Sequence, residues 1–182
     1  MLQPMKYPLP PFLQGIVTQS KYCKWLHCKA DTLRRRDLRM NRPYAKANSV
    51  AVYKALIHEA ISQNGEVDPY TGDSLHWDLI GFWDNKPIPK RALVPISGLS
   101  TLFAKIIYKV NLSHASMGLD KKYGFLPHEY YLMPTIDHCE PESEILRFEV
   151  CSWIVNAGKN QLTPQEYIAL CQKVVGHIAG EG

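Results

Sequence analysis

The stretch PTIDHCEPESEILRFEVCSWIVNAGK, residues 134–159, sets the architecture expected for this chain. Residues 130–138 and 145–151, which overlap it, are rich in Tyr, Ile, Phe and Val, the residue types that favour strands. Six mainly polar residues with one proline separate them, so the pattern predicts an antiparallel hairpin. Residues 152–159 predict one short helix after it. Because a hairpin returns the chain, the end of its first strand should lie beside that helix.

Three polar residues are expected to meet at this place. Asp137 and His138 close the first strand, and Asn156 lies on the short helix. A carboxylate and an amide oxygen are hard ligands suited to Mg²⁺ or Mn²⁺. A histidine, with an ordinary pKa of about 6.5, can accept a proton at neutral pH. Neighbouring strand residues face opposite sides, so Asp137 and His138 need either a bend or separate roles.

The rest of the chain reads mainly as helices and loops. Residues 19–41 predict a helix with Ser20 as a candidate N-cap, and 48–64 predict a second, amphipathic helix. DPYTGDSLHW, residues 68–77, predicts a turn. Residues 99–110 fit a buried helix or a strand equally well. The sequence TPQE at 163–166 forms a capping box that opens a last helix ending near Gly176.

Positive charge is concentrated between residues 21 and 46. This segment has nine basic and two acidic residues, a net charge of +7, which leaves −3 on the remainder. A dense basic block beside a mildly acidic body predicts contact with a polyanion, here nucleic acid. Two alternatives stay open. In the first, the block is only a solvated helix face. In the second, it is a protein-interaction or dimerisation helix with Trp25 and Leu33 at the contact.

Composition restricts the class of protein. The 182 residues, 46% hydrophobic and 21% charged, are typical of one compact domain, here with an appended helical arm. No run of eighteen apolar residues occurs, and the N-terminal fifteen residues contain four prolines, so neither a membrane span nor a signal peptide is expected. Five cysteines without CxxC spacing predict neither a disulfide framework nor a structural zinc, even with His27 between Cys23 and Cys28. A cytoplasmic location is expected.

Three motifs resemble one known family. PTIDH (134–138), VNAGK (155–159) and LTPQE (162–166) are similar to the HNH endonucleases, also called ββα-metal nucleases. The similarity covers 134–175, with a weaker match at 68–77. It implies an α+β fold with a ββα-metal core at 130–176 and an N-terminal helical extension. The implied organisation is an extended segment at 1–18, a helical basic arm at 19–64, and a nuclease domain at 65–182.

The resemblance also implies a function and a role for each site residue. The function is metal-dependent endonucleolytic cleavage of DNA, expected to be double-stranded. His138 resembles the general base, and Asp137 and Asn156 resemble the ligands of a single Mg²⁺ or Mn²⁺ ion. Lys159 either contacts phosphate or occupies the helix C-terminus, where a cation is favourable in any case. The residues expected to bind nucleic acid are Arg34, Arg35, Arg36, Arg39 and Lys159. A homodimer is compatible with these features.

Two departures from the family pattern occur, and the first of them keeps a rival open. The Asn expected on the second strand falls near Arg147, and the cysteines of the family's zinc knuckle are replaced by Asp68 and Val155. The rival is a non-catalytic nucleic-acid-binding or protein-interaction module on a degenerate HNH core. His114 and His128 remain alternative bases.

Overall fold

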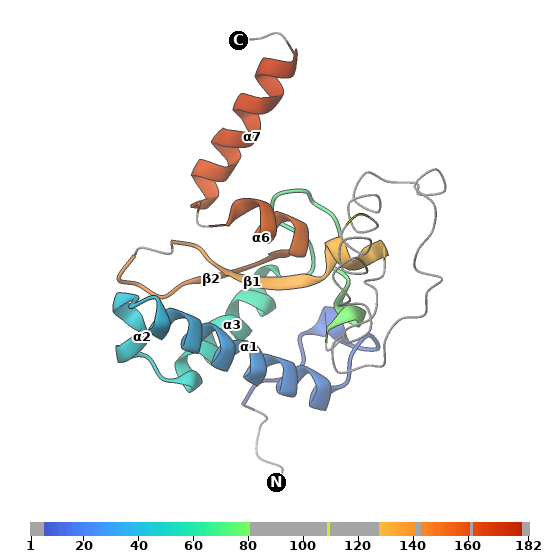
Figure 1. The fold of residues 1–182 in the computed structure, drawn as a ribbon. Coiled ribbons are helices and arrows are strands. Elements are labelled where there is room, and N and C mark those ends of the chain that lie inside the picture. The colour runs from blue at the N-terminus through green and yellow to red at the C-terminus, as the bar shows by residue number, and fades with distance from the viewer. Residues whose placement is uncertain (1–5, 81–108, 110–127, 141–142, 161, 180–182) are drawn as a thin grey trace.

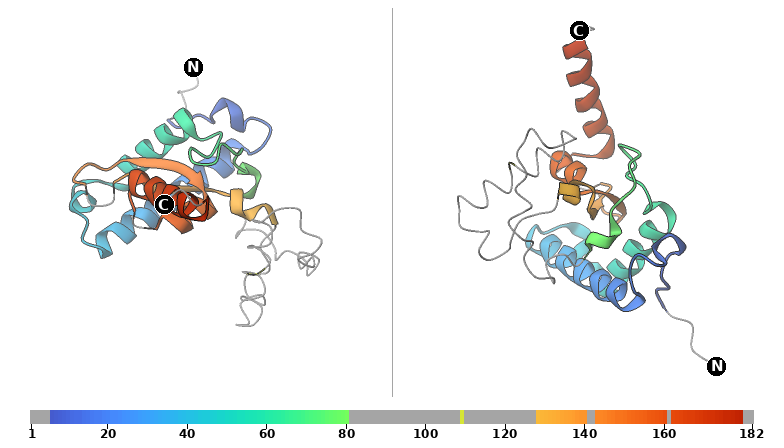
Figure 2. Two further views of the ribbon diagram at one scale, coloured as in Figure 1. Left: turned by 90° about the horizontal axis from the view of Figure 1, so that it is seen from above. Right: turned by 90° about the vertical axis from the view of Figure 1, so that its right-hand side faces the viewer.

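The computed structural model describes residues 6–80, 109, 128–140, 143–160 and 162–179, which form a mixed α+β fold (Figure 1). A layer of helices lies on one side of a two-stranded antiparallel sheet, and a short helix lies on the other side (Figures 1 and 2). The undecided segment 99–110, apart from residue 109, and His114 lie outside the described residues.

The helical layer consists of α1 (Gln19–Arg39), α2 (Pro43–Ala47) and α3 (Val50–Asn64). The two long helices predicted at 19–41 and 48–64 are therefore confirmed to within two residues. The N-cap of α1 is Thr18, whose side chain accepts a hydrogen bond from the Lys21 amide, so the expectation of Ser20 is wrong by two residues. Single-turn 3₁₀ elements occur at Pro11–Leu13, Trp77–Leu79 and His128–Leu132.

The predicted hairpin is present. Strand β1 (Pro134–His138) pairs antiparallel with β2 (Phe148–Ser152), with Asp137 opposite Glu149. Both strands are shorter than predicted, and residues before β1 form a 3₁₀ turn instead. Helix α6 (Trp153–Lys159) follows β2 directly, and the Ser152 side chain caps it by accepting from the Val155 amide.

Helix α1 is a structural part of the core rather than a separate arm. Its buried Tyr22, Leu26 and Leu33 belong to the same hydrophobic cluster as Ile136 and Phe148 of the hairpin. Trp25 is also in this cluster, with its ring 5.4 Å from that of Trp77. Trp25 and Leu33 are therefore not available as the outward contact that the dimerisation alternative places there.

Asp68 ties the 68–77 turn to the start of α6. One carboxylate oxygen accepts the backbone amides of Tyr70 and Thr71, and the other accepts the amide of Ser152. Gly72 holds a positive φ of 74° in this turn, a conformation that suits glycine. The side chain of Asp68 is fully buried, so its hydrogen bonds join the turn to the start of α6 inside the fold.

Replacing Asp68 by Ala should lower the free energy of unfolding by about 1–3 kcal/mol, because the buried amide of Ser152 loses its acceptor. Urea denaturation measures this. Asp73→Ala, a carboxylate on the same turn, is the matched control and should change little, since surface substitutions usually fall within about 0.5 kcal/mol. Equal losses in both variants would show that the Asp68 contacts contribute no specific stability.

The last helix, α7 (Pro164–Ala179), opens with the predicted capping box. The Thr163 amide donates to the Glu166 carboxylate, and the Glu166 amide donates back to the Thr163 hydroxyl. The helix extends away from the rest of the molecule (Figure 1) and continues past Gly176, the predicted end. Within the described ranges, no helix has the length and apolar character needed to cross a membrane.

Candidate functional site

A small polar pocket lies where the α1–α2 connection, the end of β1 and α6 meet. Its volume is about 130 Å³, and its lining includes Arg36, Arg42, Asp137, His138, Asn156 and Asn160. The three residues predicted as base and metal ligands therefore line one cavity. A larger groove of about 680 Å³ runs between α3 and β2, and its lining includes none of those three.

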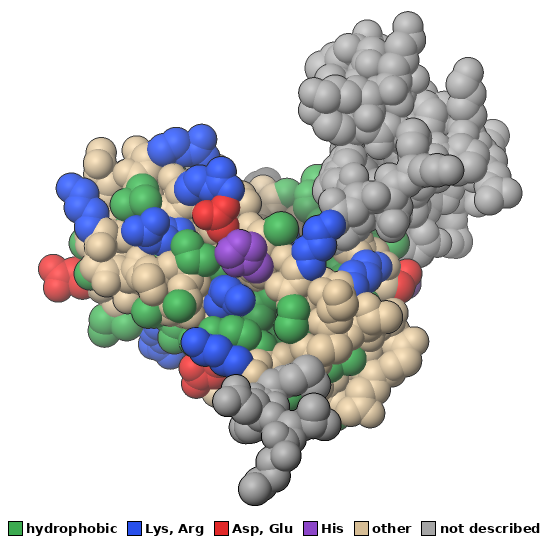
Figure 3. Space-filling model, turned by 90° about the horizontal axis from the view of Figure 1, so that it is seen from below, with side chains coloured by type: hydrophobic (Ala, Val, Ile, Leu, Met, Phe, Trp, Pro, Cys, Tyr) green, Lys and Arg blue, Asp and Glu red, His purple; other side chains and the backbone are tan. Residues whose placement is uncertain are grey.

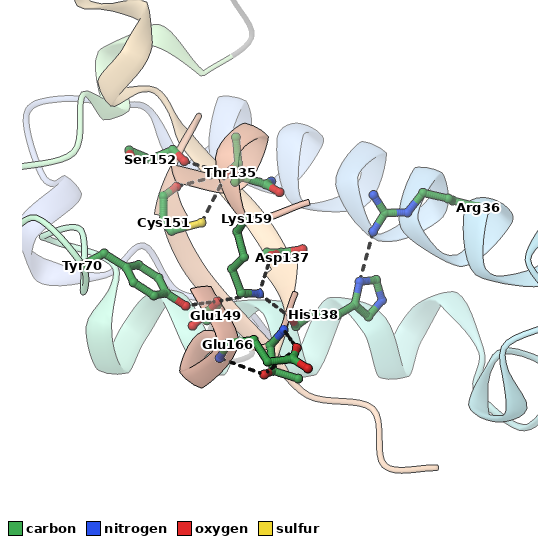
Figure 4. Close-up of polar contacts among 12 residues, drawn as sticks. Arg36, Tyr70, Thr135, Asp137, His138, Glu149, Cys151, Ser152, Lys159 and Glu166 are labelled. Atoms are coloured by element: carbon green, nitrogen blue, oxygen red, sulfur yellow. Dashed lines mark hydrogen bonds and ion pairs between the residues drawn. The ribbon is translucent and has the colours of Figure 1, made fainter. Parts of the chain in front are cut away.

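His138 is fixed from four sides. Its Nε2 lies 2.9 Å from Asp37 Oδ2. Its Nδ1 lies 3.0 Å from a terminal nitrogen of Arg36, a contact that Figure 4 shows. The ring stacks on Tyr44 with centroids 5.8 Å apart and packs against Phe148 at 5.0 Å. Only 2% of the side chain is exposed. The helical layer therefore determines the orientation of the imidazole.

These two hydrogen bonds assign the tautomer. A guanidinium has donors and no acceptor, so Nδ1 of His138 must accept from Arg36 and carries no proton. The proton of the neutral ring is then on Nε2 and is donated to Asp37. A carboxylate behind a histidine in this way fixes both tautomer and ring orientation, leaving the opposite nitrogen as the proton acceptor.

Asp37 is a fully buried carboxylate at the end of α1. It accepts hydrogen bonds from His138 and from the Tyr53 hydroxyl at 2.8 Å, and its second oxygen lies 3.5 Å from Arg42 Nε. Burial alone raises the pKa of this carboxyl, but the donors His138 and Tyr53 and the Arg36 charge outweigh it and lower the pKa. Asp37 is therefore ionised at neutral pH.

This lowered pKa predicts a pH-dependent stability. A depressed carboxyl pKa stabilises the fold above its unfolded value of about 3.9, and the contribution is lost as the pH falls through the folded value. Asp37→Asn should therefore be less stable than the wild type at pH 7, by about 1–3 kcal/mol, and the difference should shrink toward pH 3. Urea denaturation at both pH values measures it. The matched control is Asp31→Asn, at a partly exposed surface carboxylate paired with Arg35, which should change little at either pH.

Lys159 forms the second charged cluster, on the α6 side of the hairpin. Its fully buried ammonium donates to Asp137 Oδ2 at 2.7 Å and to the backbone oxygen of His138 at 3.2 Å (Figure 4). Glu149 Oε1 lies 3.2 Å away and also accepts from the Tyr70 hydroxyl. Burial alone lowers the pKa of Lys159, but the two carboxylates outweigh it and raise the pKa.

Asp137 and His138 thus point to opposite sides of β1, one toward α6 and the other toward α1. Of the two alternatives predicted for these neighbouring strand residues, a bend or separate roles, the opposite orientations are those of a regular strand and leave the second. The sequence leaves two expectations for Lys159, contact with a nucleic-acid phosphate or a favourable place at a helix C-terminus. In the structure its ammonium pairs with the carboxylates of Asp137 and Glu149. The second expectation, a favourable cation in the last turn of a helix, describes its place in α6.

The amide of Asn156 has a defined orientation. Its Nδ2 donates to the Thr135 hydroxyl at 3.0 Å, and that hydroxyl donates in turn to the Cys151 carbonyl at 3.1 Å. Because the Thr135 proton is used on Cys151, the hydroxyl can only accept from Asn156. The Asn156 carbonyl oxygen is thereby left for another partner at the pocket. In the described part of the chain, no cluster of three or more His, Cys, Asp or Glu side chains suited to a metal is present.

The predicted arginines of α1 have different surroundings. Arg34 donates to the backbone oxygen of Asn48 at 2.8 Å, and Arg36 donates to His138. Arg35 pairs with Asp31, and Arg39 is exposed beside it on a shallow surface depression. Figure 3 shows Lys and Arg side chains spread over the face seen from below, rather than gathered in one block. The segment's charge is thus divided between internal contacts and surface.

Sequence reasoning missed two site residues, Asp37 and Arg42. Both were counted only as part of the charged segment, yet Asp37 is the partner of His138 and Arg42 is 5% exposed at the pocket. One signal existed for Asp37. It follows Leu33 by four residues, so it continues the buried stripe of α1, where an acidic residue requires a partner.

A scan against protein-family models, a search of curated proteins and a search of solved structures find no match for this chain.

Proposed function

We propose that this protein is a metal-dependent endonuclease that hydrolyses phosphodiester bonds of double-stranded DNA on an HNH-like ββα-metal core. The observation that carries the proposal is the Asp37–His138 pair beside the polar pocket. A neutral histidine with its Nε2–H held by a buried carboxylate has an oriented lone pair on Nδ1. Two arginines at the same pocket suit a phosphate, because guanidinium groups match its oxygens in geometry and charge.

In the proposed reaction, His138 Nδ1 takes a proton from a water molecule while the oxygen of that water forms a bond to phosphorus. The bond between phosphorus and the 3′ oxygen breaks, and the departing oxygen takes a proton from solvent. The products are a 5′-phosphate and a 3′-hydroxyl. Asp37 holds the ring and stabilises the imidazolium that forms. Arg42, fixed by the Tyr44 hydroxyl at 3.1 Å, is placed to offset charge on the phosphate.

The residues at the pocket fit one divalent cation. Asp137 accepts from Lys159 with Oδ2 and retains a second carboxylate oxygen, and the orientation of Asn156 leaves its carbonyl oxygen for a ligand. One carboxylate, one amide oxygen and several waters form a coordination set that Mg²⁺ commonly accepts. When bound, such an ion supplies Lewis-acid stabilisation of the phosphate and of the departing oxygen.

A specific contact favours the rival, a nucleic-acid-binding module without hydrolysis. The Lys159 ammonium already lies 2.7 Å from Asp137 and 3.2 Å from Glu149, as a resident cation would. Together with Arg36 and Arg42, it places positive charge around the position that a divalent ion would take. In this rival function, the pocket binds phosphate, and the only role of Lys159 is to stabilise the fold.

Plasmid nicking separates the two functions. Purified full-length protein is incubated with supercoiled plasmid in Mg²⁺, in Mn²⁺ or in EDTA, and binding to the same plasmid is measured in parallel. The proposal expects open-circular product with either metal and none in EDTA. Binding without nicking in either metal would reject hydrolysis and favour the binding module.

The basic surface of α1 predicts a salt-dependent affinity. For duplex DNA, log K falls with log salt by about 0.9 per phosphate contact. Arg35 and Arg39 are the residues to replace, since Arg34 and Arg36 have internal contacts. Changing both to Ala should flatten the slope by up to about two units and weaken two unrelated duplex sequences equally. An unchanged slope would place the DNA contact on another surface.

A further inference from the structure

Arg36 covers the nitrogen that the proposed reaction needs. Its terminal nitrogen donates to His138 Nδ1 at 3.0 Å, as Figure 4 shows. A lone pair engaged in this hydrogen bond cannot accept a proton from water at the same time. The structure therefore holds the proposed base in a blocked state, with a cation rather than a water molecule at Nδ1.

The two arginines of the pocket are held very differently. Arg42 is 5% exposed, and its guanidinium contacts both Asp37 and the Tyr44 hydroxyl. The side chain of Arg36 is 41% exposed, and its Nε lies 4.0 Å from the nearest Asp37 oxygen. That Nε is buried and has no hydrogen-bond acceptor among the described residues. Arg36 can therefore rotate away from His138 with the loss of one strong contact.

The pocket suits the group that would draw Arg36 away. At about 130 Å³ it has the volume of roughly four water molecules, enough for a tetrahedral oxyanion and an attacking water. Asn160, which lines the pocket, combines a φ of 52° with a ψ of −112°, outside the left-handed region that asparagine tolerates, and strain of this kind is often retained at ligand sites. A phosphate there would offer Arg36 two charged acceptors in place of one neutral nitrogen.

The geometry points to Arg36 as a phosphate-responsive cover of His138. Without substrate, the guanidinium rests on Nδ1 and keeps the base inactive. When a phosphodiester enters the pocket, the guanidinium leaves His138 and binds the phosphate, with its Nε also hydrogen-bonded. Nδ1 of His138 is then exposed to a water molecule. Substrate binding and release of the base are then one event, so Arg36 is a positioning residue as well as a phosphate ligand. This inference rests on the proposed function.

The test uses ¹⁵N-labelled full-length protein in a phosphate-free buffer containing EDTA, with dimethyl phosphate as a diester probe that is not turned over. Nuclear magnetic resonance follows Nδ1 of His138. In the wild type, dimethyl phosphate should move this resonance toward that of a ring nitrogen without a hydrogen-bond donor from arginine. In Arg36→Ala the resonance should already be displaced before the probe is added. Lys173→Ala, at an exposed basic residue on α7 that has no part in the pocket or the basic surface of α1, should behave as the wild type.

A wild-type Nδ1 resonance that saturating dimethyl phosphate leaves unchanged would overturn the inference, whether or not Arg36→Ala folds. The absence of any binding would overturn it as well. These failures are distinct from failure of the proposed function. Plasmid nicking together with an unresponsive Nδ1 would leave the nuclease and reject the cover. A responsive Nδ1 without nicking would leave a phosphate-gated binding pocket and reject hydrolysis.

Discussion

Replacing His138 by Gln should reduce the rate of plasmid nicking by about 10²–10⁴-fold, the usual contribution of a positioned general base. Gln can keep both hydrogen bonds of the imidazole, because its amide nitrogen can donate to Asp37 and its carbonyl can accept from Arg36. The variant should therefore remain folded and bind DNA, yet it cannot take a proton from water. Single-turnover nicking with saturating protein measures the chemical step.

His58→Gln is the matched control for this experiment. His58 lies on α3, where its Nδ1 is 2.7 Å from the Tyr22 hydroxyl, and it does not line the pocket. Its replacement should leave nicking nearly unchanged. If His138→Gln cleaves at the wild-type rate while circular dichroism shows a normal fold, the base must be another group. His114 and His128, left open by the sequence, are then the next residues to replace.

Replacing Lys159 by Met should lower the free energy of unfolding by about 3–5 kcal/mol, the typical cost of removing one partner from a buried ion pair. The methionine fills a similar volume, but it leaves the carboxylates of Asp137 and Glu149 without their shared cation. Urea denaturation at pH 7 measures the loss. Lys46→Met, at an exposed position in α2, is the control and should fall within about 0.5 kcal/mol of the wild type.

A second variant separates charge from packing at this site. In Lys159→Met combined with Asp137→Asn, one uncompensated charge is also removed, so part of the lost stability should return and the two effects should not add. The raised pKa of Lys159 further predicts that its contribution is fully present below the ordinary lysine value of about 10.4 and is lost only as the pH rises above it. A loss below about 1 kcal/mol for Lys159→Met would mean that water replaces the ammonium readily.

The local signals in the sequence predicted the secondary structure around the site. Strand-forming residues, a short polar connection and the TPQE capping box each act over a few residues, and the hairpin, α6 and the start of α7 lie where these signals placed them. The hairpin in turn brought Asp137, His138 and Asn156 to one pocket. This placement was predictable because the hairpin and α6 follow one another in the chain, so local signals are enough to bring them together.

The partners that come from distant segments were not predictable in the same way. Asp37 meets His138 across 101 positions of the chain, and Lys159 turns inward to Asp137 because both carboxylates of the hairpin face α6. The +7 segment was interpreted as an exposed arm, since net charge does not show which side chains are buried. Only the packing of α1 on the hairpin distinguishes the buried Asp37 and Arg42 from the exposed Arg35 and Arg39, and shows that the partly exposed Arg36 contacts His138.

The protonation of the His138 ring tests the central claim most directly, because the proposed chemistry requires an Nδ1 without a proton. Two-bond ¹H–¹⁵N correlation spectra of the full-length protein at neutral pH, assigned by comparison with His138→Gln, distinguish the two tautomers. The Asp37 and Arg36 contacts predict a neutral ring protonated at Nε2. A ring protonated at Nδ1 would contradict the account, because the nitrogen facing Arg36 and the pocket could then not act as the base.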